Sequence, residues 1–175
     1  MRTSLQSGTA VEIASGDNPT RGVVVVPDIM GLRPLFDDMV ERLAVKYDWK
    51  VAAVEPFPGR ESMTLEERMI AMAALDDDRQ VADIVAASYM VDIEPVAVLG
   101  FCMGGMYTMK AAATGRFDRA APFYGMIRVP EAWRGPVRWE CAVRVPRQAT
   151  QAGGPLRDYA RRKVRDGPVA GKRRR

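Results

Sequence analysis

Histidine is absent from all 175 residues of the sequence, and cysteine occurs only twice. Without histidine the chain lacks the commonest zinc ligand and the usual general base for a serine or cysteine nucleophile. Two cysteines cannot form a framework of several disulfide bridges, so a reducing, cytoplasmic setting is the simpler expectation. Both absences narrow the kinds of site that the sequence can carry.

Long hydrophobic runs are absent as well. The longest, near residues 23–26 and 96–106, are much shorter than the roughly 20 residues that a membrane-spanning helix needs. Residues 1–16 contain charged and polar side chains and lack the apolar core of a signal peptide. We therefore expect a cytoplasmic protein with no membrane partner. Its length and its hydrophobic fraction of 47% suit a single globular domain.

Charge is distributed unevenly along the chain. Residues 1–135 hold 14 Lys+Arg and 19 Asp+Glu, whereas residues 136–175 hold 12 and 3. We predict an α/β domain over residues 1–135 and a basic tail over residues 136–175, disordered or non-native. Such a tail is either an arm for nucleic acid or another polyanion, or the product of out-of-frame translation of a GC-rich gene. We favour the second interpretation, a truncated or frame-shifted chain.

Runs of β-branched residues alternate with helical patterns up to residue 129. Strands are expected at residues 9–15, 22–27, 51–55, 95–100 and 119–125. Helices are expected at residues 34–47, 65–91 and 104–113. This alternation predicts a mostly parallel sheet with helices on both faces.

Two of the predicted helices have informative details. The apolar face of helix 34–47 is expected to consist of Leu35, Phe36, Met39, Leu43 and Ala44. The 65–91 segment is expected to break near residues 76–78. These three aspartates are more typical of a solvated bend with a helix N-cap than of a cation site.

The most informative motif is the segment 98–105, with the form strand, Gly-x-Cys-x-Gly-Gly, helix. This is the pattern of a nucleophile elbow with Cys102 as the nucleophile. Gly100 and Gly104 give room for a tight turn with a strained backbone. The helix N-terminus favours the thiolate, and the N–H of Met103 is a candidate oxyanion donor. The alternative is a structural cysteine between unrelated glycines.

A second oxyanion donor is expected from the loop after an earlier strand. Residues 26–31 lie at the end of the buried run 22–27, at the edge of the sheet where parallel strands place ligand chemistry. The backbone N–H of Ile29 is our candidate. Asp28 either contacts the Cys102 thiol or caps the following helix, and the sequence leaves both open.

These two segments resemble the dienelactone hydrolase family of the α/β-hydrolase fold. That family has a cysteine in a Gly-x-Cys-x-Gly-Gly elbow, here residues 100–105. It also has an acidic residue before Ile, a large apolar residue and Gly, here residues 28–31. The family usually has Glu where this chain has Asp28. Residues 123–125 (Phe-Tyr-Gly) also suit the family, and the resemblance covers roughly residues 9–133.

The resemblance implies an ester or lactone substrate, attacked by the Cys102 thiolate to give a thioester acyl-enzyme. Asp28 would join Cys102 as a catalytic residue, and no cofactor or metal is implied. If the substrate bears a carboxylate, Arg60 or Arg68 could pair with it, although a solubilising surface position is the commoner role for arginine. The oligomeric state stays open.

The family's triad also needs an Asp or Glu and a His after the nucleophile. The basic tail stands where both are expected, and no copy of the chain has a histidine to supply. We therefore expect deacylation to be impaired and activity to stop at a stoichiometric burst. The alternative is a non-catalytic, degenerate hydrolase scaffold whose tail binds nucleic acid or a protein partner.

Overall fold

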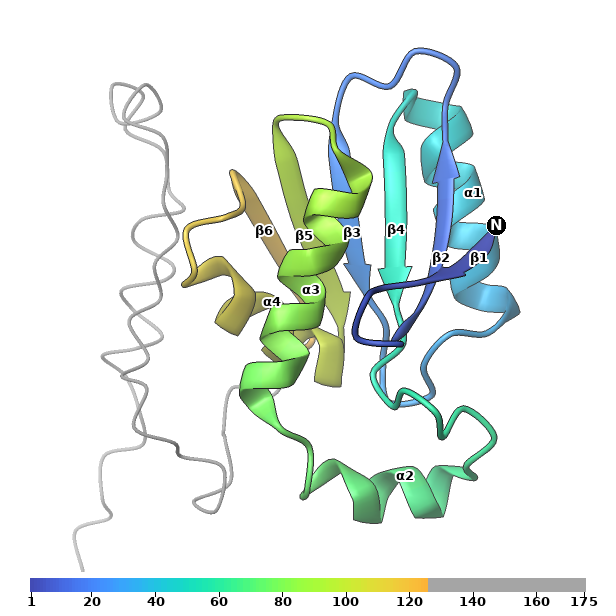
Figure 1. Ribbon diagram of the computed structural model, residues 1–175, viewed down its shortest axis with the longest axis vertical. Coiled ribbons are helices and arrows are strands. Elements are labelled where there is room, and N and C mark those ends of the chain that lie inside the picture. Colours follow the sequence, from blue (N-terminus) through green and yellow to red (C-terminus); the bar gives the residue numbers. More distant parts are fainter. Residues whose placement is uncertain (126–175) are drawn as a thin grey trace, which may run out of the picture. The chain divides into compact units, whose positions relative to one another are not determined.

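The computed structural model describes residues 1–125 (Figure 1). The expected basic tail at residues 136–175 lies outside the described residues. The strands are β1 (Arg2–Ser4), β2 (Ala10–Ser15), β3 (Gly22–Val26), β4 (Lys50–Val54), β5 (Val96–Phe101) and β6 (Arg119–Phe123). The helices are α1 (Pro34–Tyr47), α2 (Leu65–Met72), α3 (Asp77–Val91) and α4 (Met103–Ala112).

The strands form one mixed sheet in the order β1-β2-β4-β3-β5-β6. The pairs β3–β4, β3–β5 and β5–β6 are parallel, and the pairs that involve β2 are antiparallel. All five residues of β3 are buried, as its continuous β-branched run predicts. The carboxyl ends of β3, β4 and β5 therefore meet at one edge, where the predicted functional loops emerge.

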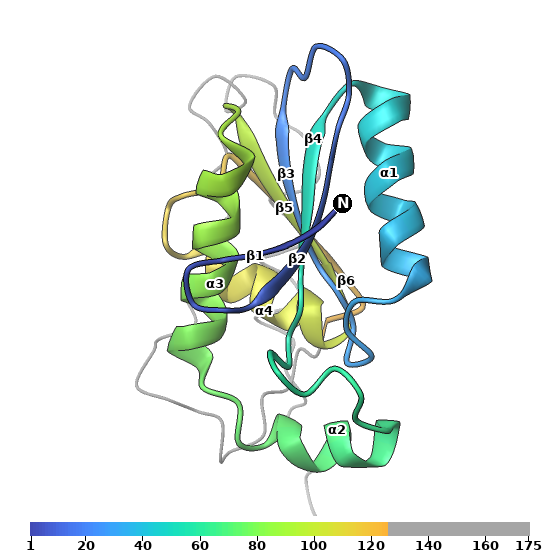
Figure 2. The same cartoon turned by 45° about the vertical axis from the view of Figure 1, so that its right-hand side comes forward.

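Helices cover both faces of the sheet, which confirms the predicted α/β class. Figure 2 shows α1 on one side of the strands and α3 and α4 on the other. Phe36 and Val40 of α1 pack with Val23 and Val25 of β3. The opposite core contains, among others, Val24, Ile84, Val91, Val98 and Met106.

Helix α1 differs from the predicted apolar face at two positions, Leu35 and Val40, because the prediction included the first and omitted the second. Its buried residues are Phe36, Val40 and Ala44, whereas Leu35 is 50% exposed. The spacing i, i+4, i+8 places the first three on one stripe, and Leu35, one residue earlier, points away from it. Sequence analysis also missed β1, a three-residue strand that pairs only with β2 among the described residues.

The break predicted in segment 65–91 is confirmed. Helix α2 ends at Met72, and α3 starts after Asp76, whose side chain accepts hydrogen bonds from the N–H groups of Asp78 and Arg79. Helix α2 begins with a capping box between Thr64 and Glu67, whose hydrogen bonds hold the pKa of Glu67 below its ordinary value. No helix within residues 1–125 combines the length and hydropathy needed to cross a membrane.

Candidate active site

Cys102 lies at the sharp turn between β5 and α4. Its backbone has φ 53° and ψ −117°, a conformation that costs a non-glycine residue energy and persists only where the surroundings enforce it. Its N–H donates to the carbonyl of Phe123 at the end of β6 (3.0 Å), and its own carbonyl accepts from Gly105 (3.0 Å). The strained turn expected from the sequence is therefore present, with a partly exposed thiol.

The glycines on either side of Cys102 are required by close backbone contacts. A Cβ on Gly100 would lie 2.3 Å from the carbonyl oxygen of Gly104, and one on Gly104 would lie 2.2 Å from the carbonyl oxygens of Val26 and Pro27. Both distances are impossible for a real side chain. The start of α4 is thus pressed against the end of β3, which brings the elbow to the loop that carries Ile29.

That loop is a tight turn over residues 28–31. The carbonyl of Asp28 accepts from the N–H of Gly31 (2.9 Å), and the Asp28 carboxylate accepts from the N–H of Met30 (2.9 Å). Among the described residues, the N–H groups of Ile29 and Met103 have no hydrogen-bond acceptor. Both candidate oxyanion donors are therefore unused, and they follow neighbouring parallel strands.

The Asp28 carboxylate is paired with Arg33. The guanidinium donates from both terminal nitrogens, at 2.7 and 2.8 Å, and this pairing raises the pKa of Arg33 above its ordinary value. Within residues 1–125 no hydrogen bond joins Asp28 to the Cys102 thiol. The alternative that Asp28 caps the next helix is wrong, because α1 has Arg33 as its N-cap residue and no side-chain cap.

A buried ion pair that the sequence did not predict lies at the same edge of the sheet. Glu55, directly after β4, and Arg68 of α2 have side chains only 0% and 3% exposed, with 3.3 Å between Nη1 and Oε1. Arg68 is therefore not the solvated surface arginine that is the commoner case, whereas Arg60 is exposed. The available signal was a carboxylate immediately after a buried strand.

Aromatic side chains border the elbow on the β6 side. The Phe101 ring stacks on Phe123 with centroids 5.0 Å apart and lies 6.1 Å from the ring of Tyr124. Phe123 and Tyr124 are 46% and 74% exposed. Gly125 is packed against Gly105, where a Cβ would meet the neighbouring backbone at 2.8 Å. Residues 123–125 thus lie beside Cys102.

An open groove of about 640 Å³ lies elsewhere, between β2 and α1. Its lining includes Glu12, Asp37 and Lys50, and both carboxylates are already paired with Arg2. No residue of the 28–31 turn or of the elbow at residues 100–105 lines this groove. In the part of the chain that the structure describes, no cluster of three or more His, Cys, Asp or Glu side chains could hold a metal ion.

Comparison with known proteins agrees with this geometry. The family model described as "Dienelactone hydrolase family" matches residues 9–146. A protein from Bradyrhizobium sp named "Probable 2-oxo-3-(5-oxofuran-2-ylidene)propanoate lactonase" is 30% identical over 114 residues, which are 60% of this chain and 46% of that protein. The chain thus spans about half the length of this curated relative.

Solved structures show the same fold. The crystal structure of "Putative Dienelactone Hydrolase" from Klebsiella pneumoniae subsp. pneumoniae MGH 78578 superposes with a TM-score of 0.61 at 20% identity, covering 74% of this chain and 61% of that one. A structure named "m3DLH" has a TM-score of 0.51 at 19% identity, covering 75% and 62%. At these identities the likeness shows the fold alone.

Proposed function

The chain belongs to the dienelactone hydrolase family, and from that membership we propose that it is an ester or lactone hydrolase with Cys102 as its nucleophile. The observation that carries the proposal is the strained backbone of Cys102 between two glycines that tolerate no side chain. Such strain is maintained at functional turns, where it presents a reactive side chain to solvent. The lactonase named among the relatives, with a propanoate in its substrate name, supports a lactone that carries a carboxylate.

The proposed reaction starts with attack of the Cys102 Sγ on the carbonyl carbon of the substrate. The bond to the leaving oxygen breaks as a thioester forms on Sγ, and the leaving oxygen takes a proton from solvent. An ester releases its alcohol at this step, whereas a lactone opens and keeps the new hydroxyl or enol on the bound acyl group. The developing oxyanion accepts hydrogen bonds from the N–H groups of Ile29 and Met103. Donors that are already fixed and unused stabilise this charge without reorganising, which is the main source of acyl-transfer catalysis.

We propose a catalytic role for Asp28 as well, by the family resemblance. Its support is its position, because its carboxylate belongs to the turn that presents the Ile29 N–H. Arg33 holds that carboxylate at both oxygens, so it must leave Arg33 to act on the thiol. The Asp28→Asn variant tests this role through the rate of Cys102 acylation.

The second half of the reaction is expected to be slow. Hydrolysis of the thioester needs a water activated by a base, and the 175 residues contain no histidine. Loss of a triad member lowers the rate by on the order of 10⁴–10⁶. The chain should therefore accumulate its acyl-enzyme and turn over only a few times.

The test is a burst experiment with p-nitrophenyl acetate on the full chain. We expect release of close to one equivalent of p-nitrophenolate per chain, followed by a very slow phase, and an acetyl group on Cys102 by peptide mass spectrometry. Cys102→Ala should abolish the burst, and Cys141→Ser, the matched control at the other cysteine, should keep it. Rapid multiple turnover would contradict the proposed impairment, and no acylation of Cys102 would contradict the nucleophile.

The second candidate is a non-catalytic scaffold with a basic segment, favoured by the 12 Lys+Arg against 3 Asp+Glu in residues 136–175. Binding of this kind depends on salt, because each phosphate contact releases counterions. Salt-sensitive retention on heparin that disappears when residues 136–175 are deleted would support it. Retention that survives the deletion would contradict it.

A further inference from the structure

The position of the Ile29 N–H depends on a network that the proposed reaction does not itself use. Within the turn, the peptide that carries this N–H is fixed through its other end, because the Asp28 carbonyl accepts from Gly31. Gly31 has φ +68°, and a Cβ there would lie 2.5 Å from a carboxylate oxygen of Glu55. The turn therefore rests directly on Glu55.

Glu55 is a fully buried carboxylate with a full set of partners. It accepts from the N–H of Leu32 (2.8 Å) and of Phe57 (3.0 Å) and pairs with Arg68. The Leu32 contact fixes the end of the 28–31 turn from outside. A buried charge with this many directed hydrogen bonds has little freedom to move.

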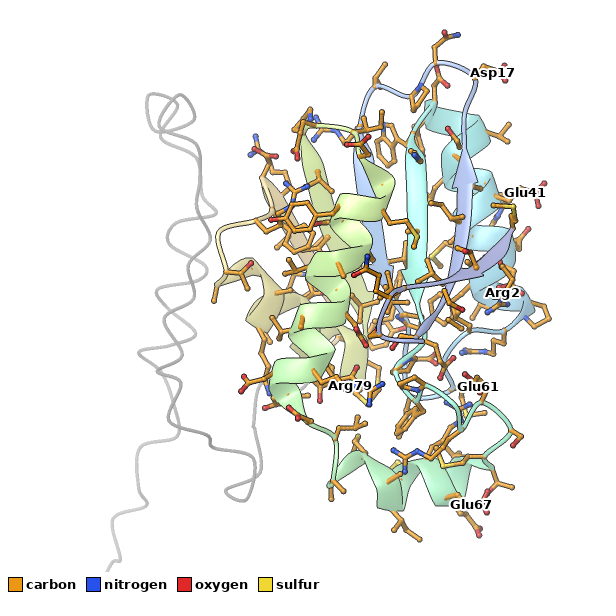
Figure 3. All side chains as sticks on the ribbon, viewed as in Figure 1. Arg2, Asp17, Glu41, Glu61, Glu67 and Arg79 are labelled. Carbon is orange, nitrogen blue, oxygen red and sulfur yellow. The ribbon has the colours of Figure 1, made fainter. Side chains whose placement is uncertain are left out.

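Arg68 holds the same turn from the other side. Its Nη1 donates to the carbonyl of Ile29 (3.3 Å) as well as to Glu55, so one guanidinium bridges the turn and the carboxylate. Its remaining nitrogens donate to the carbonyls of Glu61 and Met63, which anchors it in the segment before α2. Figure 3 shows Glu61 in that segment, between β4 and α2.

Resting on the proposed function, we propose that Glu55 and Arg68 are positioning residues for acyl transfer: they hold the Ile29 peptide so that its N–H points to the oxyanion. The peptide groups on both sides of Ile29 are fixed. The one before Ile29 is held by the Gly31 N–H, and Gly31 packs against Glu55. The one after Ile29 is held by Arg68, which donates to the Ile29 carbonyl. Neither side chain contacts the substrate. Removing Arg68 frees the Ile29 carbonyl and leaves the Glu55 charge without its cation.

The chain offers a matched control for the loss of such an arginine. Arg116 also binds a carboxylate, Glu94, a backbone carbonyl, that of Ser88, and an aromatic ring, that of Tyr89. Glu94 precedes β5, so this second cluster lies at the amino ends of the parallel strands, opposite the elbow. Arg116→Met therefore removes an arginine with the same kinds of partner without touching Ile29, from a pair whose side chains are more exposed, 16% for Arg116 and 61% for Glu94.

The experiment compares two reactions of the same thiol in a Cys141→Ser background. Acylation by p-nitrophenyl acetate needs an oxyanion hole, whereas alkylation by iodoacetamide displaces iodide from sp³ carbon and needs none. We expect Arg68→Met to slow acylation by about 10- to 100-fold. This decrease is no larger than the decrease caused by removing one oxyanion donor outright. Alkylation should stay within about threefold, and Arg116→Met should leave the ratio of the two rates unchanged. Arg68→Lys, which keeps the charge, should recover part of the acylation rate.

Three outcomes would overturn the positioning role. In the first, Arg68→Met acylates at the parent rate. In the second, acylation and alkylation fall together, which is what general loss of structure produces. In the third, the parent chain alkylates but never acylates at Cys102, and the proposed function fails with it. Should Arg68→Met not fold, as judged by circular dichroism, Glu55→Gln keeps the shape of the carboxylate, and its ratio of acylation to alkylation decides the question by the same criteria.

Discussion

Gly104 is a single residue on which the geometry of the whole site depends. Its Cα lies where a side chain would meet the carbonyls of Val26 and Pro27, so α4 can begin directly against the end of β3. That approach brings the start of α4, with Met103, against the end of the strand that leads into the Ile29 turn. The requirement is steric, because the obstructing atoms are backbone and cannot rotate away.

At this position we expect Gly104→Ala to destabilise the fold by about 3 kcal/mol, the upper part of the range for overpacking, and to abolish the acylation burst. This loss of stability is opposite in sign to the effect of helix propensity, which favours alanine over glycine within a helix by about 1 kcal/mol. Urea unfolding and the p-nitrophenyl acetate burst measure the two effects.

The control is Gly59→Ala, at a position with φ +74° and no atom within 4 Å of the added Cβ. There only the left-handed backbone costs energy, about 1 kcal/mol, and the burst should survive. A Gly104→Ala chain as stable as the parent would show that α4 can shift away from β3.

At the scale of elements, α3 shows how a polar cluster starts a helix. The Asp76 carboxylate accepts hydrogen bonds from Asp78 (3.0 Å) and Arg79 (3.2 Å), two of the N–H groups that a helix leaves unsatisfied at its first turn. Asp77, the next residue, pairs with Lys110 of α4. The acidic run therefore begins α3 and ties it to its neighbour α4.

Asp76→Ala should lower the free energy of unfolding by about 1 kcal/mol, the usual loss for an N-cap. Asp76→Asn is the matched control, because asparagine caps as well as aspartate and should cost only a few tenths of a kcal/mol. Denaturant titration of both variants measures the difference. Equal losses would mean that the charge near the helix terminus, rather than the capping hydrogen bonds, supplies the stability.

At the scale of the described molecule, the sheet separates two cores. Val40 of α1 is fully buried in one, and Val91 of α3 is fully buried in the other. Truncating either to alanine removes two methyl groups and leaves a cavity, which costs about 2 kcal/mol. Because the side chains share no partner across the sheet, the double variant should lose the sum within about 0.5 kcal/mol.

Urea unfolding of the two single variants and the double variant checks this additivity. A coupling energy well above 0.5 kcal/mol would show that the two cores are linked through the strands, for example by a shift of β3. The comparison needs a cooperative transition in the parent chain.

The sequence determined most elements and the candidate nucleophile by local pattern. Continuous β-branched runs predicted β3, β4 and β5, and Gly-x-Cys-x-Gly-Gly predicted the strained turn at Cys102, because local sterics permit few alternatives there. Among the strands that the structure describes, only β1 was not predicted, because three residues are too few to show a hydrophobic period. Proline and aspartate predicted where α1 and α3 begin for the same local reason.

Tertiary structure alone decided which distant groups meet. Ile29, Glu55 and Arg68 come from three segments, and only the parallel order of β3, β4 and β5 brings them to one edge of the sheet. Asp28 was a candidate partner of the Cys102 thiol, whereas in the structure its carboxylate forms an ion pair with Arg33. The cause is physical: a turn is specified by the residues within it, whereas the partner of a buried charge is specified by packing between elements that the sequence does not place side by side.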